Sequence, residues 1–186
     1  LIYKGAKAYN DYADFLHSLG ALLWVARIGL IAFFLLHFVF TMMLVVQNRK
    51  ARDSRYHAGF GKTRQLSTKL MPVSGTILLI YIGTHLLDFT FTDSTSLNAV
   101  VNNEYLGLYG LVYNSFLNPI RVVWYIVAML SVGFHLTHAV QSVFQTFGFS
   151  NDRYLNTLQK ISITSGLLIA IGYAAIPVYI NIIHRI

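Results

Sequence analysis

Four long apolar segments dominate the sequence and restrict the folds that are open to it. They cover about 21–46, 70–91, 120–147 and 158–183. Each can cross the roughly 30 Å hydrocarbon core of a bilayer as a helix. The chain is only 11% charged, whereas soluble domains are about 25% charged. We therefore predict an all-α fold, a polytopic transmembrane helix bundle in which residues 1–186 form one domain.

Positive charge is concentrated in one connection between spans. The connection at 92–118 has no Lys or Arg, although the chain carries a formal net charge of +7. Under the positive-inside rule we expect the loops 47–69 and 148–157 to be cytoplasmic. Charge clustered in this way argues against a nucleic-acid partner and for contact with membrane lipid. Seven of the 14 Lys and Arg residues fall in the basic loop: Arg49, Lys50, Arg52, Arg55, Lys62, Arg64 and Lys69.

The remaining segments add local expectations. Residues 1–20 mix polar and aromatic side chains and predict an amphipathic segment on the outer surface. Aromatic residues between 105 and 113 predict a short interfacial helix. Pro72 should lie in the first turn of its span, where a missing N–H does least harm. The chain has no cysteine, which excludes iron–sulfur clusters and thiolate-bound metals.

Single histidines interrupt three of the apolar segments, at His37, His85 and His135. An ionisable side chain at membrane depth is costly and is usually functional. One such residue alone can simply form a hydrogen bond between helices. Three of them on three helices favour axial ligation of a b-type haem.

The depths of the histidines indicate how they pair. His37 lies ten residues before the cytoplasmic end of its span and His135 twelve before that of a parallel span, so both lie at one level. His85 should lie roughly 8–12 Å further from the cytoplasm, from the helical rise per residue. We therefore predict that His37 and His135 share one haem. His85 then implies a second haem whose other ligand is absent from this sequence.

Nearby residues have more than one interpretation. Gly29, Gly83 and Gly133 could leave room for a flat porphyrin, or serve plain helix packing. His138 shares a face with His135. Because one helix normally provides one axial ligand per haem, His138 is expected to bond a propionate or a neighbouring helix.

Three stretches of the sequence resemble a known family. They are LLWVARIGLIAFFLLHFVF, MPVSGTILLIYIGTHLLDF and FLNPIRVVWYIVAMLSVGFHLTHAVQSVFQTFG. They resemble the dihaem cytochrome b membrane anchor of succinate:quinone and fumarate:quinone oxidoreductases, above all the bacterial b558-type family. The resemblance covers nearly the whole chain.

The resemblance implies a bacterial cytoplasmic-membrane protein of five spans with two haems b. The first span, with one haem ligand, would then precede this sequence. His37 and His135 would hold the haem nearer the cytoplasm, and His85 would hold the distal haem. Such subunits anchor an iron–sulfur subunit and a flavoprotein subunit, and they pass electrons between the iron–sulfur subunit and menaquinone or ubiquinone. The dicarboxylate chemistry belongs to those partners.

Other candidate residues follow from position. Arg27, about 15 Å from His37 along one helix, and Arg121 are candidates for contact with haem propionates, although both could be interfacial snorkelling residues. Asp14 and Asp88 are candidates for proton delivery to a quinone on the outer side, although Asp88 could merely cap a helix. The alternatives for the whole chain are the cytochrome b subunit of a hydrogenase or formate dehydrogenase, and a haem-free transporter or pigment-binding subunit.

Overall fold

The protein is a bundle of long helices, four of which are long and apolar enough to cross a membrane. The computed structural model describes residues 1–51, 62–93, 97–148 and 152–183. The predicted all-α, membrane-embedded bundle is therefore confirmed. Within the described residues the candidate spans are Ala21–Lys50, Leu70–Phe89, Pro119–Thr146 and Tyr154–Ile182.

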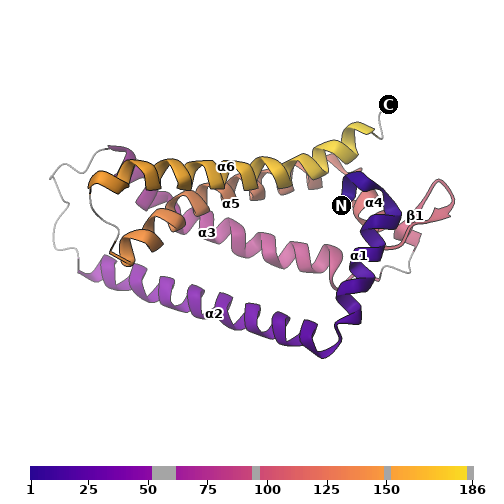
Figure 1. Ribbon diagram of the computed structural model, residues 1–186, viewed down its shortest axis with the longest axis horizontal. Coiled ribbons are helices and arrows are strands. Elements are labelled where there is room, and N and C mark those ends of the chain that lie inside the picture. Colours follow the sequence, from indigo (N-terminus) through magenta and orange to yellow (C-terminus); the bar gives the residue numbers. More distant parts are fainter. Residues whose placement is uncertain (52–61, 94–96, 149–151, 184–186) are drawn as a thin grey trace.

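The spans alternate in direction along the chain (Figure 1). Helices α2 (Ala21–Lys50) and α5 (Pro119–Thr146) run away from the N-terminal helix α1 (Ala6–Ser18). Helices α3 (Lys62–Phe89) and α6 (Asp152–Ile183) run back towards it. We call the end of the bundle that carries α1 the α1 end. Parts of the loops 47–69 and 148–157, including most of the basic side chains, lie outside the described residues.

Helix α3 begins before its apolar part. It starts at Lys62, so Pro72 lies in the helix interior, and the expectation of a first-turn proline was wrong. The apolar pattern marks only the hydrophobic part of the helix, from Leu70, and cannot show that polar helical residues precede it. Pro177 also lies within a continuous α6.

Helices α5 and α6 pack most closely, at a crossing formed by two glycines. A Cβ atom on Gly133 would lie 2.7 Å from Cβ of Ala170 and 2.8 Å from the carbonyl oxygen of Gly166. Small residues of this kind let backbones approach in membranes. Gly133 therefore serves helix packing here. A Cβ atom on Gly29 or Gly83, in contrast, would have no neighbouring atom within 4 Å.

The α1 end of the bundle is closed by short elements. They are η1 (Ile2–Lys4), α1, η2 (Leu97–Ala99), the antiparallel pair β1 (Val100–Val101) and β2 (Glu104–Tyr105), and α4 (Gly107–Ser115). The last of these is a short helix in the segment where one was expected. The hairpin was not predicted; its turn residues Asn102 and Asn103 have φ of 51° and 65°, as a two-residue hairpin turn requires.

The buried hydrophobic cluster lies at this same end. It joins the N-terminal segment, α4, α5 and α6. Asn181 of α6 also donates a hydrogen bond to the Phe116 carbonyl, at 3.1 Å. The buried members of the cluster are Ile2, Val112, Phe116, Val122, Tyr125 and Ile180.

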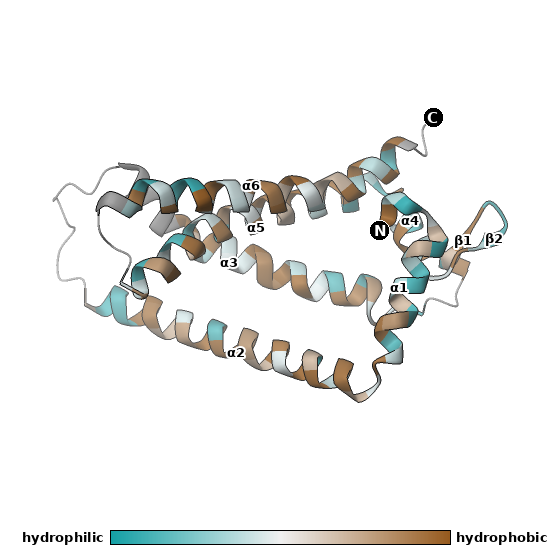
Figure 2. Cartoon of the chain, in the orientation of Figure 1, coloured by the Kyte–Doolittle hydropathy of each residue, from teal (hydrophilic) through white to brown (hydrophobic). Residues whose placement is uncertain are grey.

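Helix α2 differs from the other three spans because none of its side chains is buried. Figure 1 shows it set apart from α3, α5 and α6, and Figure 2 shows hydrophobic residues along most of its length. Phe33, for instance, is 75% exposed. Lipid tails are as apolar as leucine, so this exposure carries no penalty inside a bilayer.

Candidate histidine and polar sites

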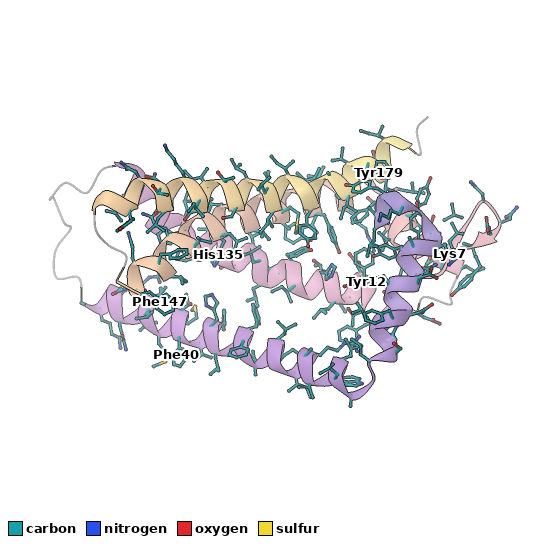
Figure 3. All side chains as sticks on the ribbon, in the orientation of Figure 1. Lys7, Tyr12, Phe40, His135, Phe147 and Tyr179 are labelled. Atoms are coloured by element: carbon teal, nitrogen blue, oxygen red, sulfur yellow. The ribbon has the colours of Figure 1, made fainter. Side chains whose placement is uncertain are left out.

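The structure places His37 of α2 beside His135 of α5. Their ring centroids are 6.3 Å apart and the ring planes are inclined at 79°. His135 lies on the side of the bundle turned towards α2 (Figure 3). His37 is exposed and His135 is half-buried. The two imidazoles thus lie next to each other, edge to face, on helices that run in the same direction.

Helix α3 also contacts the His135 imidazole. The Ser74 hydroxyl oxygen lies 3.1 Å from Nδ1 of His135, and that hydroxyl donates to the Met71 carbonyl at 3.0 Å. Beside it, a Cβ on Gly75 would lie 3.6 Å from Cε1 of His135. Ser74 itself is only 5% exposed. Sequence reasoning did not find Ser74, because no sequence signal sets the register between α3 and α5.

His85 lies at a different level, within a group of aromatic rings. Its ring centroid is 5.6 Å from Tyr81, 5.4 Å from Phe89 and 6.3 Å from Tyr125. The residue is nevertheless exposed on one side. Next to it, Nε1 of Trp124 donates to the Thr84 hydroxyl at 3.0 Å, which aligns α3 with α5 at this level.

His135 and His85 are separated along the bundle axis, and residue counts on α3 and α5 give the distance between them. Tyr125 contacts His85 and lies ten residues before His135 on α5, or about 15 Å away. Ser74 contacts His135 and lies eleven residues before His85 on α3, or about 16 Å away. The estimate of 8–12 Å from the loop boundaries was therefore too small, because it assumed that the residues chosen as the cytoplasmic ends of the spans lie at equal depth.

A polar cluster lies closer to the α1 end, where α3 stops and α5 begins. Asp88 forms a 3.3 Å ion pair with Arg121 and accepts a 2.9 Å hydrogen bond from the Tyr125 hydroxyl. Arg121 also donates to the Ser115 hydroxyl at 3.2 Å. The sequence singled out Asp88 and Arg121 separately, and the structure brings them together.

A cavity of about 250 Å³ adjoins this polar cluster. Its lining combines charged groups with amides and hydroxyls, so it suits water or a small polar group better than an acyl chain. The lining residues are Asp88, Thr92, Asn98, Leu111, Asn114, Ser115 and Arg121.

The other candidate residues take separate positions. The Arg27 guanidinium lies 5.2 Å from the Trp24 ring centroid on its own helix, within the range of a cation–π contact. Because Arg27 is ten residues before His37, it lies near the level of His85. Asp14 is exposed on α1, and His138 is half-buried one turn beyond His135.

Comparison with known proteins adds no assignment. No protein-family model, no curated protein and no solved structure matches the chain.

The His37–His135 pair has the donor set that a bis-imidazole metal site requires. With metal–imidazole bonds of about 2 Å, two rings on opposite sides of one metal ion have centroids about 6–6.5 Å apart. The observed 6.3 Å meets this requirement. Among the described residues, no three His, Cys, Asp or Glu side chains gather as a metal-binding group, so a site built only from protein ligands is not favoured. Two opposed imidazoles suit a metal whose other ligands come from a macrocycle.

Proposed function

We propose that the chain is a haem-binding membrane anchor of a succinate:quinone or fumarate:quinone oxidoreductase. In this role it passes electrons between an iron–sulfur subunit and a membrane quinone. The observation that carries the proposal is the apposition of His37 and His135, at a spacing that fits two axial ligands of one haem b. A haem b held there would accept and donate single electrons.

Packing alone explains the positions of His37 and His135 less well than haem ligation does. Aromatic rings at 6.3 Å also suit simple edge-to-face packing. However, His37 lies on a helix with no buried side chain, so its imidazole gains little from protein packing and would be left in lipid without a ligand. Ligation gives that polar side chain a partner.

His85 supports a second, distal haem site. It lies about 15 Å from the first pair along the helix axes, too far to share that haem. Its exposed side and the open space at Gly83 leave room for a macrocycle. The proposal assigns the second axial ligand of this haem to a histidine outside the 186 residues.

The polar cluster at the α1 end supports a role in quinone chemistry. Quinone reduction takes up protons, and Asp88 with Tyr125 and Arg121 forms a hydrogen-bonded group beside a cavity. We assign Asp88 to proton delivery at this end and leave Asp14, on the exposed face of α1, as a second candidate. Menaquinone and ubiquinone both suit this chemistry.

The proposal also specifies the membrane and the partner subunits. The basic loop 47–69 would face the cytoplasm of a bacterium, at the cytoplasmic membrane, and would face an iron–sulfur subunit that joins a flavoprotein subunit. With no cysteine and no nucleotide-binding glycine motif in this chain, the dicarboxylate chemistry would belong to those partners.

A spectroscopic experiment on the purified complex tests the proposal. We expect a reduced-minus-oxidised b-type spectrum with about two haems per chain, and reduction of the haem on addition of succinate. His37→Ala and His135→Ala should each lose one haem and retain the other, because each removes one ligand of the same pair. His17→Ala, on the exposed surface of α1 outside the four spans, serves as the control and should retain both.

Three outcomes would contradict the proposal. A complex without b-type absorbance would favour a haem-free transporter or pigment-binding subunit. Reduction by hydrogen or formate in place of succinate would favour the cytochrome b of another respiratory complex. Loss of different haems from the two variants would refute the pairing of His37 with His135.

A further inference from the structure

Ser74 forms the hydrogen bonds that orient the His135 imidazole. Its hydroxyl oxygen contacts two groups, the Met71 carbonyl at 3.0 Å and Nδ1 of His135 at 3.1 Å. A serine hydroxyl has one proton to donate and can also accept. The position of that proton therefore decides which nitrogen of His135 carries a hydrogen.

The carbonyl of Met71 settles the position of the proton. A carbonyl oxygen can only accept, so the Ser74 proton must point towards it for the 3.0 Å contact to be a hydrogen bond. The same hydroxyl oxygen then accepts from Nδ1–H of His135. With the proton turned the other way, two oxygen lone pairs would oppose each other at 3.0 Å.

We propose that Ser74 is a positioning residue that holds His135 as the Nδ1–H tautomer and leaves Nε2 as the free nitrogen for an axial bond. This inference rests on the proposed haem site. Metal-binding histidines commonly donate their other N–H to an oxygen acceptor, which fixes the ring orientation and raises ligand basicity. Ser74 is such an acceptor, and it lies on α3, whereas His135 lies on α5.

The surroundings of Ser74 strengthen this hydrogen bond. The serine lines an apolar groove of about 280 Å³ between α3 and α5 and is almost fully buried. With little water to compete, a hydrogen bond in such a place is stronger than one at a polar surface. The groove also contains Ser131 of α5, whose hydroxyl donates to the Val127 carbonyl of its own helix at 3.0 Å.

Three single variants of the full complex test the role of Ser74. Ser74→Ala removes the acceptor, so the haem held by His37 and His135 should bind about 10- to 100-fold more weakly. Its midpoint potential should become more positive, because a less basic imidazole stabilises ferric iron less. A tenfold change in the ferric-to-ferrous preference corresponds to about 59 mV for one electron. The second haem should keep its potential.

Two controls separate this role from a structural one. Ser74→Thr keeps a hydroxyl that can bond the same carbonyl in a helix and should restore the wild-type potential and haem content. Ser131→Ala removes a hydroxyl from the same groove without touching His135 and should leave both haems unchanged. The readouts are a potentiometric titration of the two haems and the haem retained per chain after dilution.

The outcomes distinguish failure of this inference from failure of the proposed function. If wild-type protein binds no haem, the proposed function fails. If two haems are present but Ser74→Ala leaves both potentials and the haem content unchanged, Ser74 is not a positioning residue. The inference is equally overturned if Ser74→Thr behaves like Ser74→Ala, or if Ser131→Ala has the same effect.

Discussion

Asp88 and Arg121 occupy positions that helix electrostatics alone would disfavour. Asp88 lies in the last turn of α3 and Arg121 in the first turn of α5. An anion at a helix C-terminus and a cation at an N-terminus each oppose the helix dipole, at a cost of about 0.3–1 kcal/mol. Neither charge stabilises its own helix. Their ion pair, and the Tyr125 hydrogen bond, are what hold them in place.

Removing the Asp88 carboxylate should therefore destabilise this end of the bundle. Asp88→Ala leaves the Tyr125 hydroxyl without its acceptor and removes the ion-pair partner of Arg121, and we expect a loss of about 1–3 kcal/mol. Asp88→Asn keeps an oxygen acceptor and should cost less. Thermal unfolding in lipid nanodiscs measures both.

The control for Asp88 is the exposed pair of Lys7 and Asp11 on α1. These two side chains are 2.6 Å apart but largely solvent-exposed, and surface ion pairs contribute little. The hydrogen bond to Asp11 raises the pKa of Lys7 above its ordinary value. Asp11→Asn should leave the melting temperature unchanged. An equal loss from both aspartates would show that burial at Asp88 has no special effect.

At this scale the sequence predicted candidate residues better than it predicted their partners. An isolated charge or imidazole in an apolar run is visible without a structure, so His37, His85, His135, Asp88 and Arg121 were found. Ser74 and Tyr125 were not, because serine and tyrosine are ordinary in membrane helices. Their roles arise from the register between α3 and α5, which the sequence does not show.

Among the elements, α5 and α6 owe their close contact to Gly133 and Gly166. A Cβ on Gly166 would lie 2.6 Å from Cγ2 of Thr137 and 2.5 Å from the Gly133 carbonyl oxygen, and the nearer of these is backbone that cannot easily give way. A larger side chain there must push the two helices apart.

Gly166→Leu should consequently weaken the helix pair. Overpacking of a tight contact costs about 1–3 kcal/mol, measurable as a lower melting temperature. Gly172→Leu is the matched control on the same helix, since an added Cβ there meets nothing within 4 Å. If the two variants melt alike, the glycine crossing does not hold α5 and α6 together.

The elements themselves followed from hydropathy, with errors at their ends. All four spans were predicted within a few residues, because a run of about 20 apolar residues has few alternatives. The start of α3 was missed because a polar helical turn outside the membrane has no hydropathy signal. The hairpin of β1 and β2 was missed because its strands are only two residues each.

For the whole molecule, the cover at the α1 end depends on a few side-chain contacts between distant segments. Asn10 of α1 donates to the Leu106 carbonyl at 2.9 Å and accepts from the Tyr109 amide at 3.1 Å. Near it, Tyr9 and Tyr109 pack edge to face, and burial raises the pKa of both phenols. These contacts fix α1 across the bundle.

Asn10→Ala should release α1 without unfolding the spans. Losing both hydrogen bonds leaves the Tyr109 amide of α4 without its acceptor, at a cost of about 1–3 kcal/mol, whereas the Leu106 carbonyl still accepts from the Gly110 amide at 3.2 Å. Hydrogen exchange of the α1 amides should become faster while exchange in α5 stays slow. Ser18→Ala, which removes only a bond to the Phe15 carbonyl within the same segment, should leave α1 protected; equal deprotection in both variants would contradict the role of Asn10.

The attachment of α2 has a practical consequence for anyone who solubilises this protein. Because α2 buries no side chain and meets α5 through the imidazoles at 37 and 135, detergent can replace nearly everything that surrounds it. The close contact of α5 with α6 at Gly133 and Gly166 leaves no comparable space for detergent. If these two histidines share a haem as we propose, its bleaching should come before the melting of the remaining helices as detergent strength increases, so colour would be an earlier sign of damage than loss of helicity.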